Sequence, residues 1–168
     1  SRIVKVTTDT SNFIVAGETE SQGAGGFDLY LAGINEFGSV QWEHTYGFVQ
    51  NERMQEGKDN ALQILYNPDG SVNGFVMVGT TESYSGHGAG GLDVFLIRTD
   101  PYGNELWSQT YGGSLDDKAR AVRPTADGGF IIVSQTQSFG VLGSDVYLLK
   151  TDANGVLQWD VTYNLGVN

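Results

Sequence analysis

Short apolar runs separated by turns rich in Gly, Asp and Asn recur along the chain, and the last third shows them best. Phe130–Thr136 and Asp145–Thr151 carry apolar residues on both faces, as expected of strands that are buried on both sides. Val156–Tyr163 alternates apolar and polar residues, which is typical of a strand with one face in water. With Ala119–Thr125 in front, the pattern predicts a meander of four antiparallel strands joined by tight turns.

The same arrangement occurs three times with the same marker residues. The markers are an Asp before the third strand, the Gly of the following turn, and a Trp and a Tyr in the fourth strand: Asp28, Gly38, Trp42 and Tyr46; Asp93, Gly103, Trp107 and Tyr111; Asp145, Gly155, Trp159 and Tyr163. A repeat of roughly 40–50 residues with several strands is typical of β-propeller blades. We therefore predict one continuous all-β domain of three four-stranded blades, at residues 1–47, 48–112 and 113–168.

The repeated Trp and Asp residues have structural interpretations and functional alternatives. Trp42, Trp107 and Trp159 occupy the same strand position in every blade, so we interpret them as packing between blades rather than as a platform for carbohydrate. Asp28, Asp93 and Asp145 stand where the third strand begins, and we expect them to bond to loop amides rather than to ligate a metal.

Charge and composition exclude some classes of protein. Twenty acidic residues against nine basic ones give a net charge of −11, which argues against binding to nucleic acid or to an anionic membrane surface. The chain has no Cys, so disulfides and thiolate metal sites are excluded. No run approaches the ~20 apolar residues of a membrane-spanning helix.

The predicted repeats begin close to the first residue of the chain and end close to the last. The first strand is predicted at Ile3–Thr7 and the last ends at Tyr163, so we expect three complete blades and no spare strand for a shared terminal blade. The chain begins at Ser1 without a Met or a signal peptide. We expect it to be a mature or excised piece whose targeting information lies outside it.

Segments 127–133, 144–155 and 157–159, followed by a Thr-Tyr pair, resemble the β-propeller repeats of secreted and cell-surface bacterial and archaeal proteins. Residues 111–119 resemble the joints between their blades. The resemblance implies four-stranded blades, an extracellular or cell-surface setting, and roles in binding or adhesion without a common enzymatic activity. Propellers close with 4–8 blades. Three blades depart from this pattern, so something else must complete the ring.

Loops on one rim of the blades are expected to carry the function. This rim would gather the joints Phe48–Asn60 and Gly112–Lys118 and the loops Gln22–Gly26, Tyr84–Gly91 and Phe139–Ser144. The second repeat carries about ten extra residues, which we assign to the joint Phe48–Asn60 and the turn Asn67–Gly74.

Candidate site residues are few. We predict no catalytic residue; His44 lies on an outer strand, where packing or solvent exposure explains it, and no zinc-binding pattern is present. The predicted ligand-binding residues lie in the rim loops and joints: Glu52, Asp59, Tyr84, His87, Asp116 and Asp117. No cofactor is expected, although Asp116 and Asp117 with nearby carbonyl oxygens could hold calcium.

The sequence therefore favours a non-enzymatic scaffold that assembles through blade faces and binds a glycan or protein partner. A carbohydrate-active propeller enzyme with catalytic residues in missing blades, and a subunit of an extracellular filament, remain alternatives. Three blades leave two outer faces open, which we expect to be apolar at Ile14, Leu31, Ile132 and Leu148 or their face-mates. Two copies would close a six-bladed ring, unless another chain supplies the missing blades.

Overall fold

The structure is a computed structural model, which describes residues 8–9, 12–23, 25–54, 60–82, 91–140 and 143–164. Strands and turns account for all the secondary structure in these residues, which confirms the all-β prediction. None of the described residues forms a helix long and apolar enough to cross a membrane.

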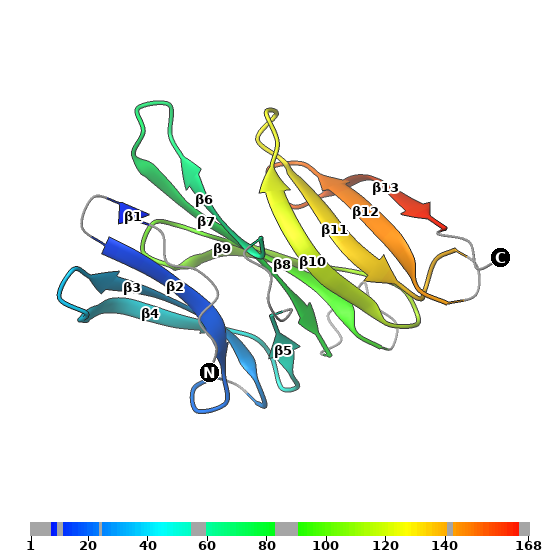
Figure 1. Cartoon of the computed structure of the whole chain (residues 1–168), viewed down its shortest axis with the longest axis horizontal. Coiled ribbons are helices and arrows are strands. Elements are labelled where there is room, and N and C mark those ends of the chain that lie inside the picture. The colour runs from blue at the N-terminus through cyan, green and yellow to red at the C-terminus, as the bar shows by residue number, and fades with distance from the viewer. Residues whose placement is uncertain are drawn as a thin grey trace.

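The strands form three antiparallel sheets in chain order (Figure 1). The first sheet contains β1 (Thr8–Asp9), β2 (Asn12–Thr19), β3 (Asp28–Asn35) and β4 (Val40–Tyr46). The second contains β5 (Glu52–Arg53), β6 (Leu62–Tyr66), β7 (Val72–Thr81), β8 (Asp93–Thr99) and β9 (Glu105–Tyr111). The third contains β10 (Asp117–Pro124), β11 (Phe130–Thr136), β12 (Asp145–Thr151) and β13 (Leu157–Tyr163).

Each sheet is a meander, and strand positions follow the sequence pattern closely. The two strands predicted as buried on both faces, Phe130–Thr136 and Asp145–Thr151, have these bounds in the structure. β10 begins two residues earlier than expected, because Asp117 still pairs with Thr136. The strand predicted at Ile3–Thr7 lies outside the described residues.

The second sheet has two short strands, β5 and β6, where the third sheet has one, and the gap between them begins inside Phe48–Asn60, the segment to which the sequence assigns extra residues. β5 and β6 lie along the same side of β7, with Glu52 opposite Thr81 and Leu62 opposite Met77. In the third sheet the single strand β10 fills this place, with a bulge at Arg120. Arg53 and Leu62 are thus farther apart in sequence than the two strand segments that flank the bulge at Arg120 in the third sheet; residues 55–59 lie outside the described part of the chain.

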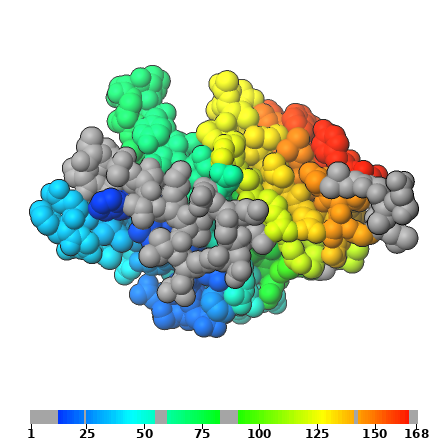
Figure 2. All heavy atoms as spheres, viewed as in Figure 1, coloured from blue at the N-terminus to red at the C-terminus, as the bar shows by residue number. Residues whose placement is uncertain are grey.

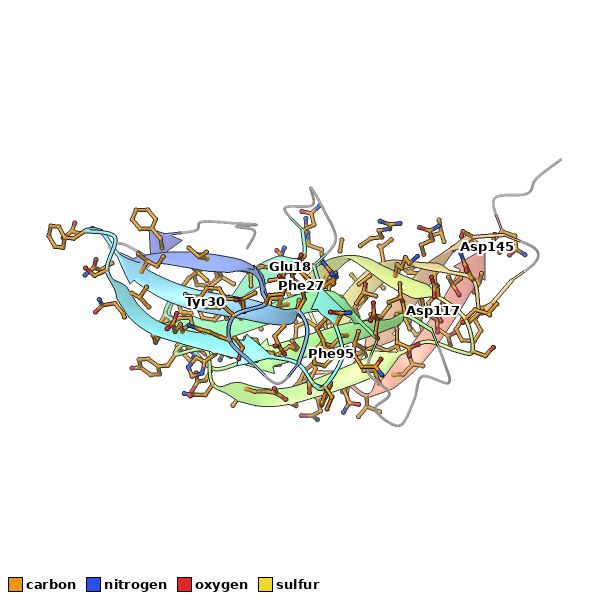
Figure 3. All side chains as sticks on the ribbon, turned by 90° about the horizontal axis from the view of Figure 1, so that it is seen from below. Glu18, Phe27, Tyr30, Phe95, Asp117 and Asp145 are labelled. Carbon is orange, nitrogen blue, oxygen red and sulfur yellow. The ribbon has the colours of Figure 1, made fainter. Side chains whose placement is uncertain are left out.

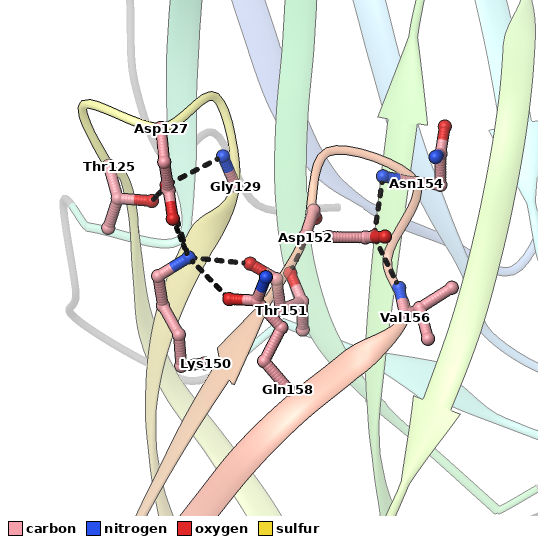
Figure 4. A network of polar contacts seen from close by, with 9 residues as sticks. All are labelled: Thr125, Asp127, Gly129, Lys150, Thr151, Asp152, Asn154, Val156 and Gln158. Carbon is pink, nitrogen blue, oxygen red and sulfur yellow. Dashed lines mark hydrogen bonds and ion pairs between the residues drawn. The ribbon is translucent and has the colours of Figure 1, made fainter.

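Tight turns between the third and fourth strands repeat in all three sheets. Asn35, Asp100 and Asp152 each accept hydrogen bonds from two backbone amides two and four residues ahead. Each turn ends on a Gly with φ near +80°, a conformation that side chains disfavour. In the third sheet the Lys150 ammonium adds hydrogen bonds, which it donates to Asp127, to the Thr151 carbonyl and to Gln158 (Figure 4).

The two faces of a sheet carry different residues. We call the face that bears the Trp of the outermost strand the forward face, and the opposite face the rear face. Strand register assigns these residues to the three forward faces: Ile14, Ala16, Leu31, Trp42 and Tyr46; Val76, Val78, Leu96, Trp107 and Tyr111; Ile131, Val133, Leu148, Trp159 and Tyr163. The rear faces of the second and third sheets carry Phe75, Met77, Phe95 and Ile97, and Phe130, Ile132, Tyr147 and Leu149.

The core lies between sheets. Side chains on the forward faces of the first two sheets and the rear faces of the last two are buried together in one cluster. Of the residues predicted to line open outer faces, Ile14, Leu31 and Ile132 belong to this cluster, so that prediction was wrong for them. Leu148 lies on the forward face of the third sheet, which no other sheet of the described residues covers and where its strand partner Val161 is exposed.

Trp107 is expected to stabilise the contact between the second and third sheets. Its ring lies 5.8 Å from that of Phe130, centroid to centroid. Trp107→Ala should lower the free energy of unfolding by about 3 kcal/mol, the low end for a large packed aromatic. Leu106→Ala is the control, because this neighbouring side chain is 58 % exposed; it should cost less than about 0.5 kcal/mol. Equal losses in urea denaturation would contradict the packing role.

Candidate functional site

Adjacent sheets are joined in the same way twice. Trp42 packs on Phe75, with ring centroids 5.9 Å apart, and Trp107 packs on Phe130. The hydroxyl of Tyr46 donates a hydrogen bond of 2.5 Å to the Gly103 carbonyl, and Tyr111 does the same to Gly155. Each joint therefore combines the forward face of one sheet with the rear face and turn Gly of the next.

The forward face of the third sheet presents the same residues to solvent. Tyr163 is 53 % exposed, whereas its counterparts Tyr46 and Tyr111 are 3 % and 8 % exposed. Trp159 is 45 % exposed and Val133 38 %. In Figure 2 β13 (red) lies at the end of the molecule opposite the first sheet (blue to cyan). This open forward face carries several exposed apolar side chains, with Lys150 and Gln135 between them by strand register, and exposed apolar groups of this kind commonly mark interaction sites.

The second candidate region is the edge of the sheets where the joints meet the loops between second and third strands. We call it the joint edge. Asn51 accepts a hydrogen bond from the Phe27 amide, and its carbonyl accepts one from Glu82. Asp116 occupies the equivalent place, with bonds from the Leu92 and Gln137 amides. The predicted gathering of joints and loops on one rim is therefore seen for the described residues.

Two carboxyl groups meet inside each joint. Asp28 lies near Glu52 in the first joint, and Asp93 lies near Asp117 in the second. A Cβ at Gly112 would lie 1.8 Å from Asp93 Oδ1 and 2.9 Å from Asp117 Oδ2. Gly47 lies between the other pair in the same manner. A Cβ at Gly47 would lie 2.1 Å from Asp28 Oδ1 and 2.3 Å from Glu52 Oε2. The close approach of the carboxyl groups thus requires glycine.

Two of these carboxylates, Glu52 in β5 and Asp117 in β10, bind the loops next to them. Glu52 accepts hydrogen bonds from the Phe48 amide at 2.9 Å and from the Thr81 hydroxyl at 2.6 Å. Asp117 accepts them from the Gly113 amide at 2.7 Å and from the Ser138 hydroxyl at 2.6 Å. Asp117 and Glu52 are fully buried. Figure 3 shows Asp117 and Asp145 at the same end of the third sheet, where both align with the end of β11.

The Asp93–Asp117 pair is suited to hold a proton. Asp93 Oδ1 and Asp117 Oδ1 are buried and have no hydrogen-bond partner among the described residues. Two buried carboxylates so close repel, whereas a protonated carboxyl gains a donor. Burial, followed by the charges of Asp117 and Asp116, raises the pKa of Asp93 to about 6. The same region holds Lys118, which pairs with Asp116 at 2.9 Å.

The sequence-predicted site residues are distributed over different places. Asp59, Tyr84 and His87 lie outside the described residues. Asp116 is half-buried at the joint edge, whereas Glu52 and Asp117 are buried within successive joints. His44 lies on β4 between Trp42 and Tyr46, with ring centroids 6.1 Å and 6.4 Å away. The structure therefore does not bring Glu52 together with Asp116 and Asp117 in one site.

Metal binding has no cluster to support it in the described part of the chain, which contains no group of three or more His, Asp or Glu side chains arranged to hold an ion. Asp116 and Asp117 have protein partners of their own, namely Lys118 and the Leu92 amide, and the Gly113 amide and Ser138. Calcium at these two residues stays a prediction.

Sequence reasoning missed two groups of residues. Tyr46, Tyr111 and Tyr163 were recognised only as repeat markers, although the Tyr hydroxyl is what ties one sheet to the next turn. Gly47 and Gly112 were not recognised at all. Their signal was a Gly that directly follows the marker Tyr in the first two repeats, where the third has Asn164.

No protein-family model matches this chain, and a search of the curated proteins finds no match either. The function must therefore be inferred from the geometry of the open forward face, the joint edge and the carboxyl pairs.

The raised pKa of Asp93 predicts that acid stabilises the protein. In the unfolded chain this carboxyl has a pKa near 3.8, so between pH 4 and 6 the folded state binds the proton more tightly. Stability contributed by Asp93 is thus present at low pH and is lost as the pH rises through 6. Between pH 5 and 7 we expect a decrease of about 1 kcal/mol in the free energy of unfolding.

Asp93→Asn should abolish this decrease, which urea denaturation at several pH values measures. Asp69→Asn removes the same charge from an exposed turn, where bonds from Ser71 lower the pKa. This control should keep the decrease between pH 5 and 7. If Asp93→Asn and the wild type have parallel profiles, the proton does not reside on this pair.

Proposed function

We propose that the chain is a non-enzymatic scaffold of propeller blades, which assembles through its open forward face and binds protein or glycan partners at the joint edge. One observation carries the proposal. The residues that join successive sheets within the chain are the Trp and Tyr of the fourth strand, and in the third repeat these residues, Trp159 and Tyr163, are presented to solvent. Because Tyr46 and Tyr111 are buried and Trp42 and Trp107 are packed at the internal joints, another sheet is the surface that fits them.

The proposal treats each sheet as one blade. Four-stranded meanders that stack face to face are the units of propellers, and propellers close with 4–8 blades. Three blades leave an open arc, so further blades must come from outside the described chain. Two copies would supply six blades, which lies within the usual range. Blades of another chain, or copies added end to end in a filament, are the other ways to cover the face.

The joint edge is the proposed surface for other partners. Phe48, Val49 and Leu115 lie there with exposed side chains, although they belong to the joints that hold the sheets together. Exposed apolar side chains beside polar groups suit a protein or glycan partner. We propose an extracellular or cell-surface setting for the protein, which rests on the resemblance of its repeats to exported propeller proteins.

Sedimentation of the purified chain at micromolar concentration tests the assembly. We expect a species of twice the 18.1 kDa chain mass and a shift toward monomer for Trp159→Ala, because the large aromatic would be central to the contact. The monomer should remain folded, since a half-exposed Trp contributes little to the isolated chain.

Leu106→Ala provides the matched control, because it removes an exposed apolar side chain from β9 outside the open face. It should sediment as the wild type does. A wild-type chain that stays monomeric and well folded at high micromolar concentration would refute assembly through this face.

A further inference from the structure

The two ends of the chain carry complementary halves of one joint. At one end the open forward face presents Trp159 and Tyr163. At the other end the β3–β4 turn presents Gly38, in the place that Gly103 and Gly155 hold at the internal joints. Figure 2 shows these ends on opposite sides of the molecule, so a single chain cannot bring them together.

The turn at Gly38 is an unused receiving site. A Cβ at Gly103 would lie 2.6 Å from Trp42 Cζ3, and one at Gly155 would lie 2.7 Å from Trp107 Cζ3. Around Gly38, which has the same φ of 80°, no atom of the described residues lies within 4 Å of that position. The neighbouring Phe37 is 82 % exposed. The space that a Trp ring fills at both internal joints is therefore open here.

We infer that the occupant of the open forward face is the first sheet of a second copy of this chain, joined head to tail. This inference rests on the proposed function and names its partner. Trp159 of one copy lies against the β3–β4 turn of the other, beside Phe13, whose place in β2 corresponds to that of Phe75 in β7 and Phe130 in β11. The Tyr163 hydroxyl donates its hydrogen bond to the Gly38 carbonyl.

The contact is centred on the turn and outer strands. Val15 and Ala32, on the rear face of the first sheet, are already buried within the chain. A second copy therefore meets the part of the face around Phe37 and Gly38. At each internal joint the Trp and the Tyr also contact the turn of the next sheet. The expected contact therefore retains the two interactions that repeat along the chain.

Head-to-tail pairing satisfies both ends, whereas face-to-face pairing does not. Two open forward faces packed on each other would leave the Tyr163 hydroxyl without a turn carbonyl and would leave Gly38 exposed in both copies. Two head-to-tail joints use every copy of Trp159 and Gly38 and close with two-fold symmetry. Since each copy carries a net charge of −11, association should strengthen when salt screens the repulsion.

A pair of variants that each damage one end tests this inference. Trp159→Ala removes the inserted ring, and Gly38→Asn places a side chain where the ring would enter. Asn is chosen because it tolerates positive φ better than other residues. Gly70→Asn is the matched control, because Gly70 also has φ near +84° and open space around it but lies in the β6–β7 turn.

Each damaged variant alone should sediment as a monomer where the wild type is dimeric, and Gly70→Asn should remain dimeric. An equimolar mixture of Trp159→Ala and Gly38→Asn should form a mixed dimer, because the intact Trp159 of one variant meets the intact Gly38 of the other. With one joint instead of two, this dimer should be at least tenfold weaker than the wild type. Differently labelled chains report it directly.

The outcomes separate the two proposals. A wild type that assembles, loses assembly with Trp159→Ala and keeps it with Gly38→Asn would overturn the head-to-tail joint while the open face remains an assembly site. A wild type that never assembles overturns both. Large polymers that both variants dissolve would support the head-to-tail joint and exclude closure into a ring.

Discussion

The contact on which the structure depends is the one between a Trp–Tyr pair and the following sheet. No sheet of four short strands can bury two apolar faces alone, so every strand that is apolar on both sides needs a neighbour. Trp42 and Trp107 fill the space at the turn glycines, and the Tyr hydroxyls fix the distance between sheet and turn through one short hydrogen bond each. The core is consequently formed at the joints between sheets rather than within any single sheet.

Each joint has a second, acidic end, which imposes a different constraint. The loops there are held by Glu52 and Asp117, whose carboxylates accept the amide hydrogen bonds that the loops offer. Burying these groups beside Asp28 and Asp93 is costly unless charge is removed. In the second joint the two ends therefore respond to different conditions, because the apolar end depends on burial and the acidic end on the protonation of Asp93.

The fold was largely predictable from the sequence because its information is local and repeated. Runs of residues that are apolar on both faces located Phe130–Thr136 and Asp145–Thr151 to the residue. Successive residues of a strand point to opposite faces of the sheet. The sequence could not indicate which of these two alternating sets faces the previous sheet, so Ile14 and Ile132 were assigned to the wrong face. The sequence also could not indicate that β5 and β6 share one strand position, since only their pairing with β7 reveals it.

An array of identical joints has a consequence that no single repeat shows. Because each joint uses the forward face of one sheet and the rear face and turn of the next, the contact is directional, and it leaves Trp159 and Tyr163 exposed at one end and the Gly38 turn open at the other. The longer β6–β7 hairpin lies within the second sheet and does not alter those ends. The exposed Trp159 and the open space at Gly38 are therefore the two features that the proposed head-to-tail joint would bring together.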